Sequence, residues 1–159
     1  MNHRILLGSY PIPTLAGIPN HNFLVWTDSQ DMPLFEINGG AVNPDGSFNY
    51  AALFGRLTAV ETDYSKRDPR RFPEFHIRPA SRMVTLLEAP RDEVAEIWAA
   101  GARTAERIAA SGLRYFILTS NSNSVATSVA RAMGLALPRA CLGPLRAPGA
   151  RRRLAVAAE

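Results

Sequence analysis

A long amphipathic helix constrains the fold of this chain more than any other feature. From Pro90 to about Ala110 the apolar residues recur at helical spacing, and Asp92 and Glu93 lie in the first turn, where negative charge suits the helix dipole. Gly112 is the expected C-cap. The apolar stripe consists of Val94, Ile97, Trp98, Ala102, Ala105, Ile108 and Ala109. This stripe is the face that the helix buries against the rest of the domain.

A strand hairpin is predicted ahead of this helix. His21–Thr27 is rich in β-branched and aromatic residues, and Leu34–Asn38 is the returning strand. Between them Asp28–Asp31 is typical of a turn, because Asp and Ser side chains bond their own backbone there. Gly39 and Gly40 are expected to end the second strand.

The centre of the chain gives weaker signals. Tyr50–Val60 fits a short helix as well as a strand, and both interpretations stay open. The charged stretch Glu61–Pro73 is expected to be a loop. Phe75–Arg78 and Arg82–Leu87 are candidate strands.

After the long helix come a strand, a polar turn and a second helix. The strand is Tyr115–Leu118, and the helix runs from about Asn123 to Met133 and ends at Gly134. This order of elements predicts an α+β fold with a mainly antiparallel sheet packed against helices. At 159 residues we expect one domain over residues 1–144, followed by an Arg- and Ala-rich tail, residues 145–159, that is partly disordered.

Composition limits the classes of function. With 47% hydrophobic and 20% charged residues the chain is ordinary for a folded protein, and no apolar run reaches the length of a membrane span. The start carries no secretory signal, so we expect a cytoplasmic protein or one exported without a conventional signal peptide. Cys141, the sole cysteine, excludes a cysteine-based zinc site and is interpreted as a structural thiol. We expect neither a metal nor a cofactor.

Positive charge comes almost entirely from arginine. The formal net charge is +4, and the two dense stretches are Arg67–Arg82 and Arg139–Arg153. Such clusters can contact an acidic protein partner, although the plain interpretation is a solvated surface. Neither stretch has interleaved aromatic residues for base stacking, which argues against nucleic acid as the partner.

The turn Asn121–Ser124 is the main candidate for function. A side chain at the start of a helix meets unsatisfied backbone N–H groups and the positive end of the helix dipole. Such a place suits a nucleophile or a bound anion, and equally a capping Ser or Asn. Taken alone, the turn is interpreted as a helix cap.

The hairpin supplies a candidate base. If Ser29 and Gln30 form a two-residue turn, His21 lies directly opposite Asn38, with Cβ atoms roughly 5 Å apart. Asn38 would then hydrogen-bond one imidazole nitrogen, fix the tautomer and leave the other nitrogen to take a proton. A slip of one residue would remove this pairing. Glu36, taken to face the other way, is the second choice for the third residue of the site.

These residues resemble the circularly permuted papain-like proteins. That superfamily includes NlpC-type hydrolases, lecithin–retinol acyltransferase relatives and desumoylating-isopeptidase-like peptidases. The likeness lies in two short blocks, His21–Val25 at the head of the first core strand and Tyr115–Ser124 before the second helix. The resemblance implies an antiparallel sheet packed on helices, with a helix-borne nucleophile facing a strand-borne His and a polar third residue on the next strand.

On this resemblance Ser122 occupies the position of the family's nucleophilic cysteine. A Ser hydroxyl is harder to ionise than a Cys thiol and depends more on its base and oxyanion donors. The chain is then a natural Ser hydrolase, a catalytically silent relative or an engineered Cys-to-Ser variant. In an enzyme, Ser122 would attack a carbonyl, His21 would act as base and Asn38 would orient it. Asn121 or Asn123 would help backbone N–H groups to stabilise the oxyanion.

Three hypotheses follow. The first is a papain-like hydrolase or acyltransferase that acts on a peptide or cell-wall amide, or, as second choice, on a lipid ester. The second is a catalytically silent relative that binds a protein or peptide. The third is a basic adaptor whose Arg clusters contact an acidic partner.

Overall fold

One antiparallel sheet with two helices makes up the part of the chain that the computed structural model describes, which is residues 1–12, 20–49, 52–66, 81–138 and 147–155. The strands are β1 (Asn2–Pro11), β2 (Asn20–Thr27), β3 (Pro33–Val42), β4 (Phe54–Asp63), β5 (Arg82–Pro90) and β6 (Arg114–Phe116). The helices are α1 (Arg91–Ala110) and α2 (Ser122–Ala132), and the 3-10 turn η2 (Tyr64–Lys66) follows β4. The predicted α+β class with an antiparallel sheet is confirmed.

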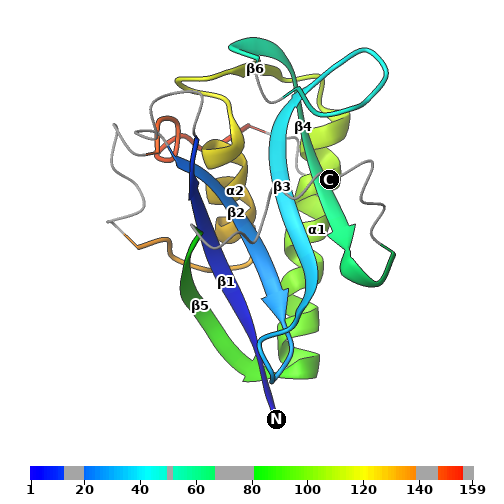
Figure 1. The fold of residues 1–159 in the computed structure, drawn as a ribbon, viewed down its shortest axis with the longest axis vertical. Helices are drawn as coiled ribbons and strands as arrows, with labels where there is room; N and C mark the ends of the chain where they lie inside the picture. Colours follow the sequence, from blue (N-terminus) through cyan, green and yellow to red (C-terminus); the bar gives the residue numbers. More distant parts are fainter. Residues whose placement is uncertain (13–19, 50–51, 67–80, 139–146, 156–159) are drawn as a thin grey trace.

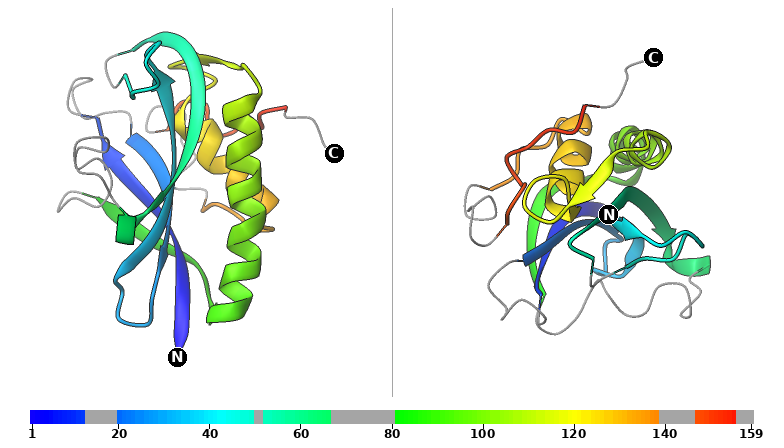
Figure 2. Two further views of the ribbon diagram at one scale, coloured as in Figure 1. Left: turned by 90° about the vertical axis from the view of Figure 1, so that its right-hand side faces the viewer. Right: turned by 90° about the horizontal axis from the view of Figure 1, so that it is seen from above.

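The strands lie in the order β5-β1-β2-β3-β4-β6, and both helices cover the same face of the sheet (Figures 1 and 2). Strand β1 pairs with β2 and β5, although sequence analysis assigned no strand to this segment. Its apolar run of three residues, Ile5–Leu7, is too short to stand out by periodicity. Within β1, Gly8 lies under Phe23: a Cβ added there would be 2.3 Å from the ring.

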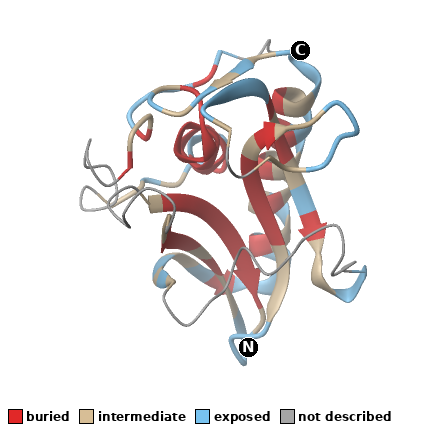
Figure 3. Cartoon of the chain, turned by 45° about the horizontal axis from the view of Figure 1, so that its top comes forward, coloured by how far each residue is buried: buried red, intermediate tan, exposed pale blue. Residues whose placement is uncertain are grey.

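The main core lies between the sheet and the helices, and Figure 3 shows β2 buried along most of its length. Alternate residues of the strands point to the helices, as the pleat requires. On the sheet side the core contains Ile5, Leu7, Leu24, Trp26, Ile37, Leu57 and Ala59, and on the helix side Val94, Trp98, Ala105, Ile108, Val125, Val129 and Met133. A smaller cluster of Tyr10, Phe23 and Val25 lies on the opposite face.

Helix α1 confirms the predicted long helix, with Pro90 at its N-cap. Asp92 and Glu93 lie in its first turn as expected. Trp98 packs into the main core and donates from Nε1 to Glu61 Oε1 at 2.5 Å on β4. This contact holds the helix against the sheet. Glu61 was predicted to lie in a loop, but β4 continues through it to Asp63.

Several predicted boundaries are wrong, each for a local reason. Gly39 and Gly40 do not end β3, because their missing side chains let neighbours approach a continuing strand: a Cβ on Gly39 would lie 2.5 Å from Val125 Cγ2. The open choice at Tyr50–Val60 resolves to strand, since β4 starts at Phe54 and runs beyond the predicted range. Phe75–Arg78 lies outside the described residues.

The strand predicted at Tyr115–Leu118 is a short edge strand. β6 pairs with β4 over three residues, and the chain then turns back through the hydrogen bond from Thr119 N to Phe116 O at 3.0 Å. Leu118 is 60% exposed, so its apolar character does not reflect a core position. The predicted strand is therefore confirmed for Tyr115 and Phe116, and it ends before Ile117 at the edge of the sheet.

Residues 147–155 of the predicted tail pack along α2. Ala147, Ala150 and Leu154 are buried. Thr127 Oγ1 on α2 donates to Ala150 O at 2.6 Å, and Leu154 N donates to Ser128 Oγ at 2.9 Å. The domain boundary predicted after residue 144 falls outside the described residues, and no helix in the described part is long and apolar enough to cross a membrane.

The contact between Gly39 and Val125 predicts a steric test of how α2 is seated. Gly39→Ala should lower the free energy of unfolding by about 1–3 kcal/mol, because an added methyl overpacks the contact with α2. Gly55→Ala in β4 is the matched control, since its Cβ would meet nothing nearer than 3.7 Å. Urea denaturation measures both, and equal losses in the two variants would contradict this packing.

Candidate functional site

The sheet opens between β2 and β3 at the end where α2 begins. These strands pair only from Leu24 opposite Ile37 to Thr27 opposite Pro33, while β3 continues to Val42 alongside β4. Figures 1 and 3 show α2 lying at this opening. Contacts of α2 with both β2 and β3 agree with that placement. The start of α2 is therefore held against the ends of two separating strands.

His21 and Asn38 form a buried hydrogen bond across this opening. His21 Nε2 and Asn38 Oδ1 are 2.6 Å apart, and the two residues are 7% and 2% exposed. An amide oxygen only accepts, so Nε2 carries the proton in this pair. In the neutral ring Nδ1 is then the nitrogen with a lone pair, which is the form that a general base requires.

The register behind this contact differs from the predicted one. His21 was expected directly opposite Asn38, but Leu24 pairs with Ile37, which places Asn38 level with Phe23. The turn is longer than two residues: Asp28 N donates to Met32 O at 2.9 Å, and Asp31 has a positive φ of 63°. The register has moved by two residues, so both side chains keep the same face and meet diagonally.

Asn121, not Ser122, caps α2. The Asn121 Oδ1 accepts hydrogen bonds from Asn123 N at 3.0 Å and Ser124 N at 3.2 Å. Ser124 Oγ reciprocates by accepting from Asn121 N at 2.8 Å, which completes a capping box. The interpretation of this turn as a helix cap is therefore confirmed, with Asn121 and Ser124 making the capping bonds in place of Ser122.

Ser122 is left as the first residue of α2 with no capping role. It is 5% exposed, and neither its hydroxyl nor its backbone N–H makes a hydrogen bond within the described part of the chain. Among the described residues this hydroxyl has no hydrogen-bond partner, and it lies next to an N–H at the positive end of a helix, where an oxyanion donor would be placed.

Asn123 joins three segments through its amide. Its Oδ1 accepts from Asn22 N on β2 at 2.9 Å, and its Nδ2 donates to Pro148 O at 3.0 Å. Asn121 Nδ2 also donates to Pro148 O at 2.8 Å and to Ile117 O. Gly149 follows with φ of 80°, where an added Cβ would lie 2.8 Å from Asn121 Oδ1. The start of α2 is thus fastened to both β2 and the C-terminal segment.

This fastening gives a structural role to two predicted site residues. Asn121 and Asn123 were predicted as oxyanion or substrate-binding groups. In the structure both side-chain amides donate to Pro148 O, so they hold segment 147–155 and the cap. The backbone N–H of Ser122 is the donor at this turn that the capping bonds leave available.

The structure brings His21 and Asn38 together, and a hydrogen bond between their sequence neighbours Asn22 and Asn123 links His21 to Ser122. His21 and Ser122 each adjoin one partner of the bond between Asn22 N and Asn123 Oδ1. No hydrogen bond joins Ser122 to His21 among the described residues. By alternation His21 lies on the same face of the sheet as Phe23, and the helices cover the opposite face. The His21 ring and the Ser122 hydroxyl could therefore approach each other only through the opening between β2 and β3.

Glu36 is a buried residue that sequence analysis placed wrongly. It was taken to face away from Asn38, yet residues two apart in a strand share a face. Glu36 is 0% exposed and accepts a hydrogen bond from Tyr64 Oη at 2.7 Å. The alternation of β3 was the signal that could have found it. Pro148 had no such signal, because it contributes only a carbonyl from a remote segment.

Comparison with protein-family models, with curated protein sequences and with solved structures found no match. Within the described ranges, no group of three or more His, Cys, Asp or Glu side chains is placed to hold a metal ion. His76 and Cys141 lie outside these ranges. The geometry around His21, Asn38 and Ser122 is therefore the feature of the described chain that bears on function.

The hydrogen bonds of Ser122 and Asn123 differ, so replacing each residue by Ala should have a different effect on the free energy of unfolding. Ser122→Ala should leave the free energy of unfolding within about 0.5 kcal/mol, because its hydroxyl has no partner in the described part of the chain. Asn123→Ala should lower it by roughly 2 kcal/mol, since the buried Asn22 N–H loses its acceptor. Thermal and urea denaturation measure both. A Ser122→Ala loss as large as that of Asn123→Ala would show a structural hydroxyl.

Proposed function

We propose that this protein is a hydrolase or acyltransferase of the circularly permuted papain-like type, acting on an amide or ester. The observation that carries the proposal is the 2.6 Å hydrogen bond between His21 Nε2 and Asn38 Oδ1, close to the start of α2. It supplies an oriented imidazole on one strand and its orienting amide on the next. The order of His, Asn and helix-borne Ser in the chain is the one that the resemblance implies.

The roles follow from the atoms. Ser122 Oγ attacks the carbonyl carbon while His21 Nδ1 takes its proton, and Asn38 holds the imidazole through Nε2. The Ser122 N–H, at the positive end of the α2 dipole, stabilises the oxyanion. His21 then returns the proton to the leaving group, and water or another acceptor releases the acyl group from Ser122. A peptide or cell-wall amide is the first proposed substrate and a lipid ester the second, both by analogy.

A catalytically silent relative that binds a protein or peptide is the second candidate. It is favoured by the Ser in the position of a Cys and by the lack of a hydrogen bond between Ser122 and His21 among the described residues. An uncharged Ser hydroxyl is a poor nucleophile unless its base is close. A binding role through an acidic partner of the Arg clusters stays a third hypothesis.

Active-site labelling tests the enzyme. A fluorophosphonate should add covalently to the chain at Ser122, as peptide mass mapping would show, and the adduct should be absent from Ser122→Ala. His21→Ala should slow labelling by about a hundredfold or more, because the base is lost. Ser29→Ala, at the exposed turn between β2 and β3, is the matched control and should label like the unaltered protein.

Replacement by the stronger nucleophile distinguishes the two candidates. Ser122→Cys in a Cys141→Ser background should react with iodoacetamide faster than Ser29→Cys in the same background, because the imidazole and helix start favour the thiolate. Phosphonate labelling of the unaltered chain supports the enzyme. Fast alkylation of Ser122→Cys without that labelling supports a silent relative. If both reactions fail, a papain-like site of either kind is contradicted.

A further inference from the structure

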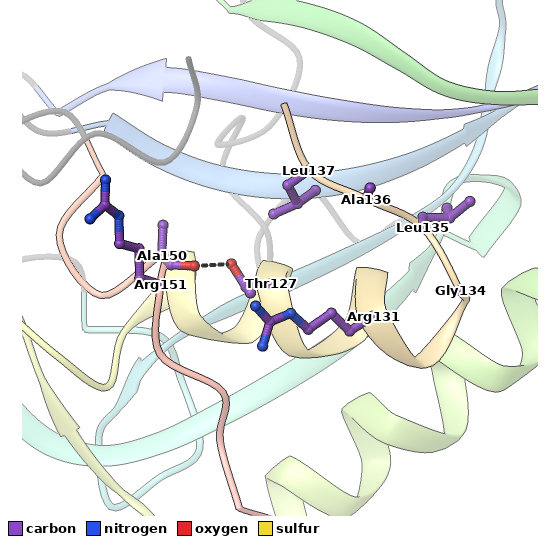
Figure 4. A pocket seen from close by; sticks show the side chains of 8 residues that line it. All are labelled: Thr127, Arg131, Gly134, Leu135, Ala136, Leu137, Ala150 and Arg151. Atoms are coloured by element: carbon purple, nitrogen blue, oxygen red, sulfur yellow. Dashed lines mark hydrogen bonds between the residues drawn. The ribbon is translucent and has the colours of Figure 1, made fainter. Parts of the chain in front are cut away.

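A hollow beside the C-terminal half of α2 is the strongest feature that the proposed catalytic site does not use. Its volume is about 620 Å³, within the range of small-molecule sites. It lies between α2, the segment that follows α2 and residues 150–151 (Figure 4). The residues that line it are Thr127, Arg131, Gly134, Leu135, Ala136, Leu137, Ala150 and Arg151. Ser122, His21 and Asn38 are not among them.

The apolar wall of this hollow is fixed in place. Gly134 has φ of 73° and turns the chain back along the helix, and Leu135 N donates to Ala130 O at 2.8 Å. Leu135 and Leu137 pack against the main core from this segment. In Figure 4 Leu137 points toward α2 across the hollow. The wall is therefore part of the packed domain.

The floor is equally well held. Thr127 Oγ1 donates to Ala150 O at 2.6 Å, a bond drawn in Figure 4, and these residues are 3% and 1% exposed. This bond fastens the C-terminal segment to α2 directly beneath the hollow. Further along, Leu154 N donates to Ser128 Oγ at 2.9 Å, which is a second hydrogen bond between residues 147–155 and α2.

Two guanidinium groups at the hollow have no acidic partner among the residues that the structure describes. Arg131 and Arg151 are exposed, and the ion pairs found within the described residues involve Arg4 and Lys66 instead. Arg131 lies in the last turn of α2, and Figure 4 shows its side chain running back along the helix toward Thr127. Two positive groups from different elements at an apolar wall complement a ligand with an anionic head and an apolar body.

We propose that this hollow binds a small organic oxyanion, a carboxylate or phosphate carried on an apolar chain. Figure 4 shows the guanidinium groups of Arg131 and Arg151 on opposite sides of the bond between Thr127 and Ala150, so each would attract the anionic head from its own side. The wall at 135–137 would cover the apolar chain. This ligand class goes beyond the proposed function, because Ser122 does not line the hollow. It gives the Arg-rich C-terminal segment a defined role in place of general positive charge.

Titration of the full chain with amphiphiles of different charge, followed by two-dimensional 1H–15N NMR, tests the proposal. Octanoate or octyl phosphate should cause saturable shifts of the amides of Thr127, Ala136 and Ala150, and whichever binds tighter identifies the head group. Octylammonium and acetate are the controls for charge and for the apolar chain. Each should bind at least tenfold more weakly than the tighter octyl anion.

Variants locate the contact. Arg131→Gln and Arg151→Gln should each weaken the tighter octyl anion about three- to tenfold. Arg152→Gln is the matched control: it is an exposed neighbour that does not line this hollow, and its affinity should stay unchanged. Ala136→Asp, at an exposed position that folding should tolerate, should abolish binding by adding a negative charge.

Four outcomes would overturn the site: equal binding of octylammonium, equal binding of acetate, equal effects of Arg152→Gln and Arg131→Gln, or shifts confined to other parts of the chain. The same titration with Ser122→Ala should give the same affinity. A failure of phosphonate labelling would therefore not bear on binding of the octyl anion, and a failure of the octyl anion to bind would not bear on the labelling of Ser122.

Discussion

The amide of Asn123 is the contact on which the arrangement around Ser122 depends. Its oxygen accepts the Asn22 N–H from β2, and its nitrogen donates to Pro148 O in the C-terminal segment. Because β2 and β3 have already separated at this level, the Asn22 N–H is buried with Asn123 as its acceptor. An unpaired buried N–H is costly, so this bond fixes the start of α2 relative to β2.

The residues of the polar turn Asn121–Ser124 make different hydrogen bonds. Asn121 and Ser124 form the capping box, and Asn123 joins strand, helix and C-terminal segment. These bonds satisfy the polar groups on either side of Ser122 and keep it at the first position of α2. Within the described residues this support leaves the Ser122 hydroxyl without a hydrogen bond, which the proposed nucleophile would require.

Local patterns in the sequence predicted the long helix, the hairpin strands and the polar turn. Their success follows from periodicity and turn chemistry, which depend on neighbouring residues alone. β1 was missed because three apolar residues carry too little periodicity, and β3 was cut short at Gly39, where the close approach of Val125 is a tertiary effect. The contact between His21 and Asn38 was expected for the wrong register, because hydrogen bonds within Asp28–Met32 make the turn longer than the two residues assumed. Pro148 could not be predicted, because a backbone carbonyl leaves no mark in the sequence.

The tautomer of His21 is the most direct test of the account, because the proposed chemistry requires a lone pair on Nδ1. Long-range 1H–15N NMR of 15N-labelled protein, at a pH where the ring is neutral, distinguishes the two imidazole nitrogens. If the site works as proposed, Nε2 carries the proton, held by Asn38 Oδ1, and this preference weakens in Asn38→Ala. A proton on Nδ1 in the neutral ring would contradict it.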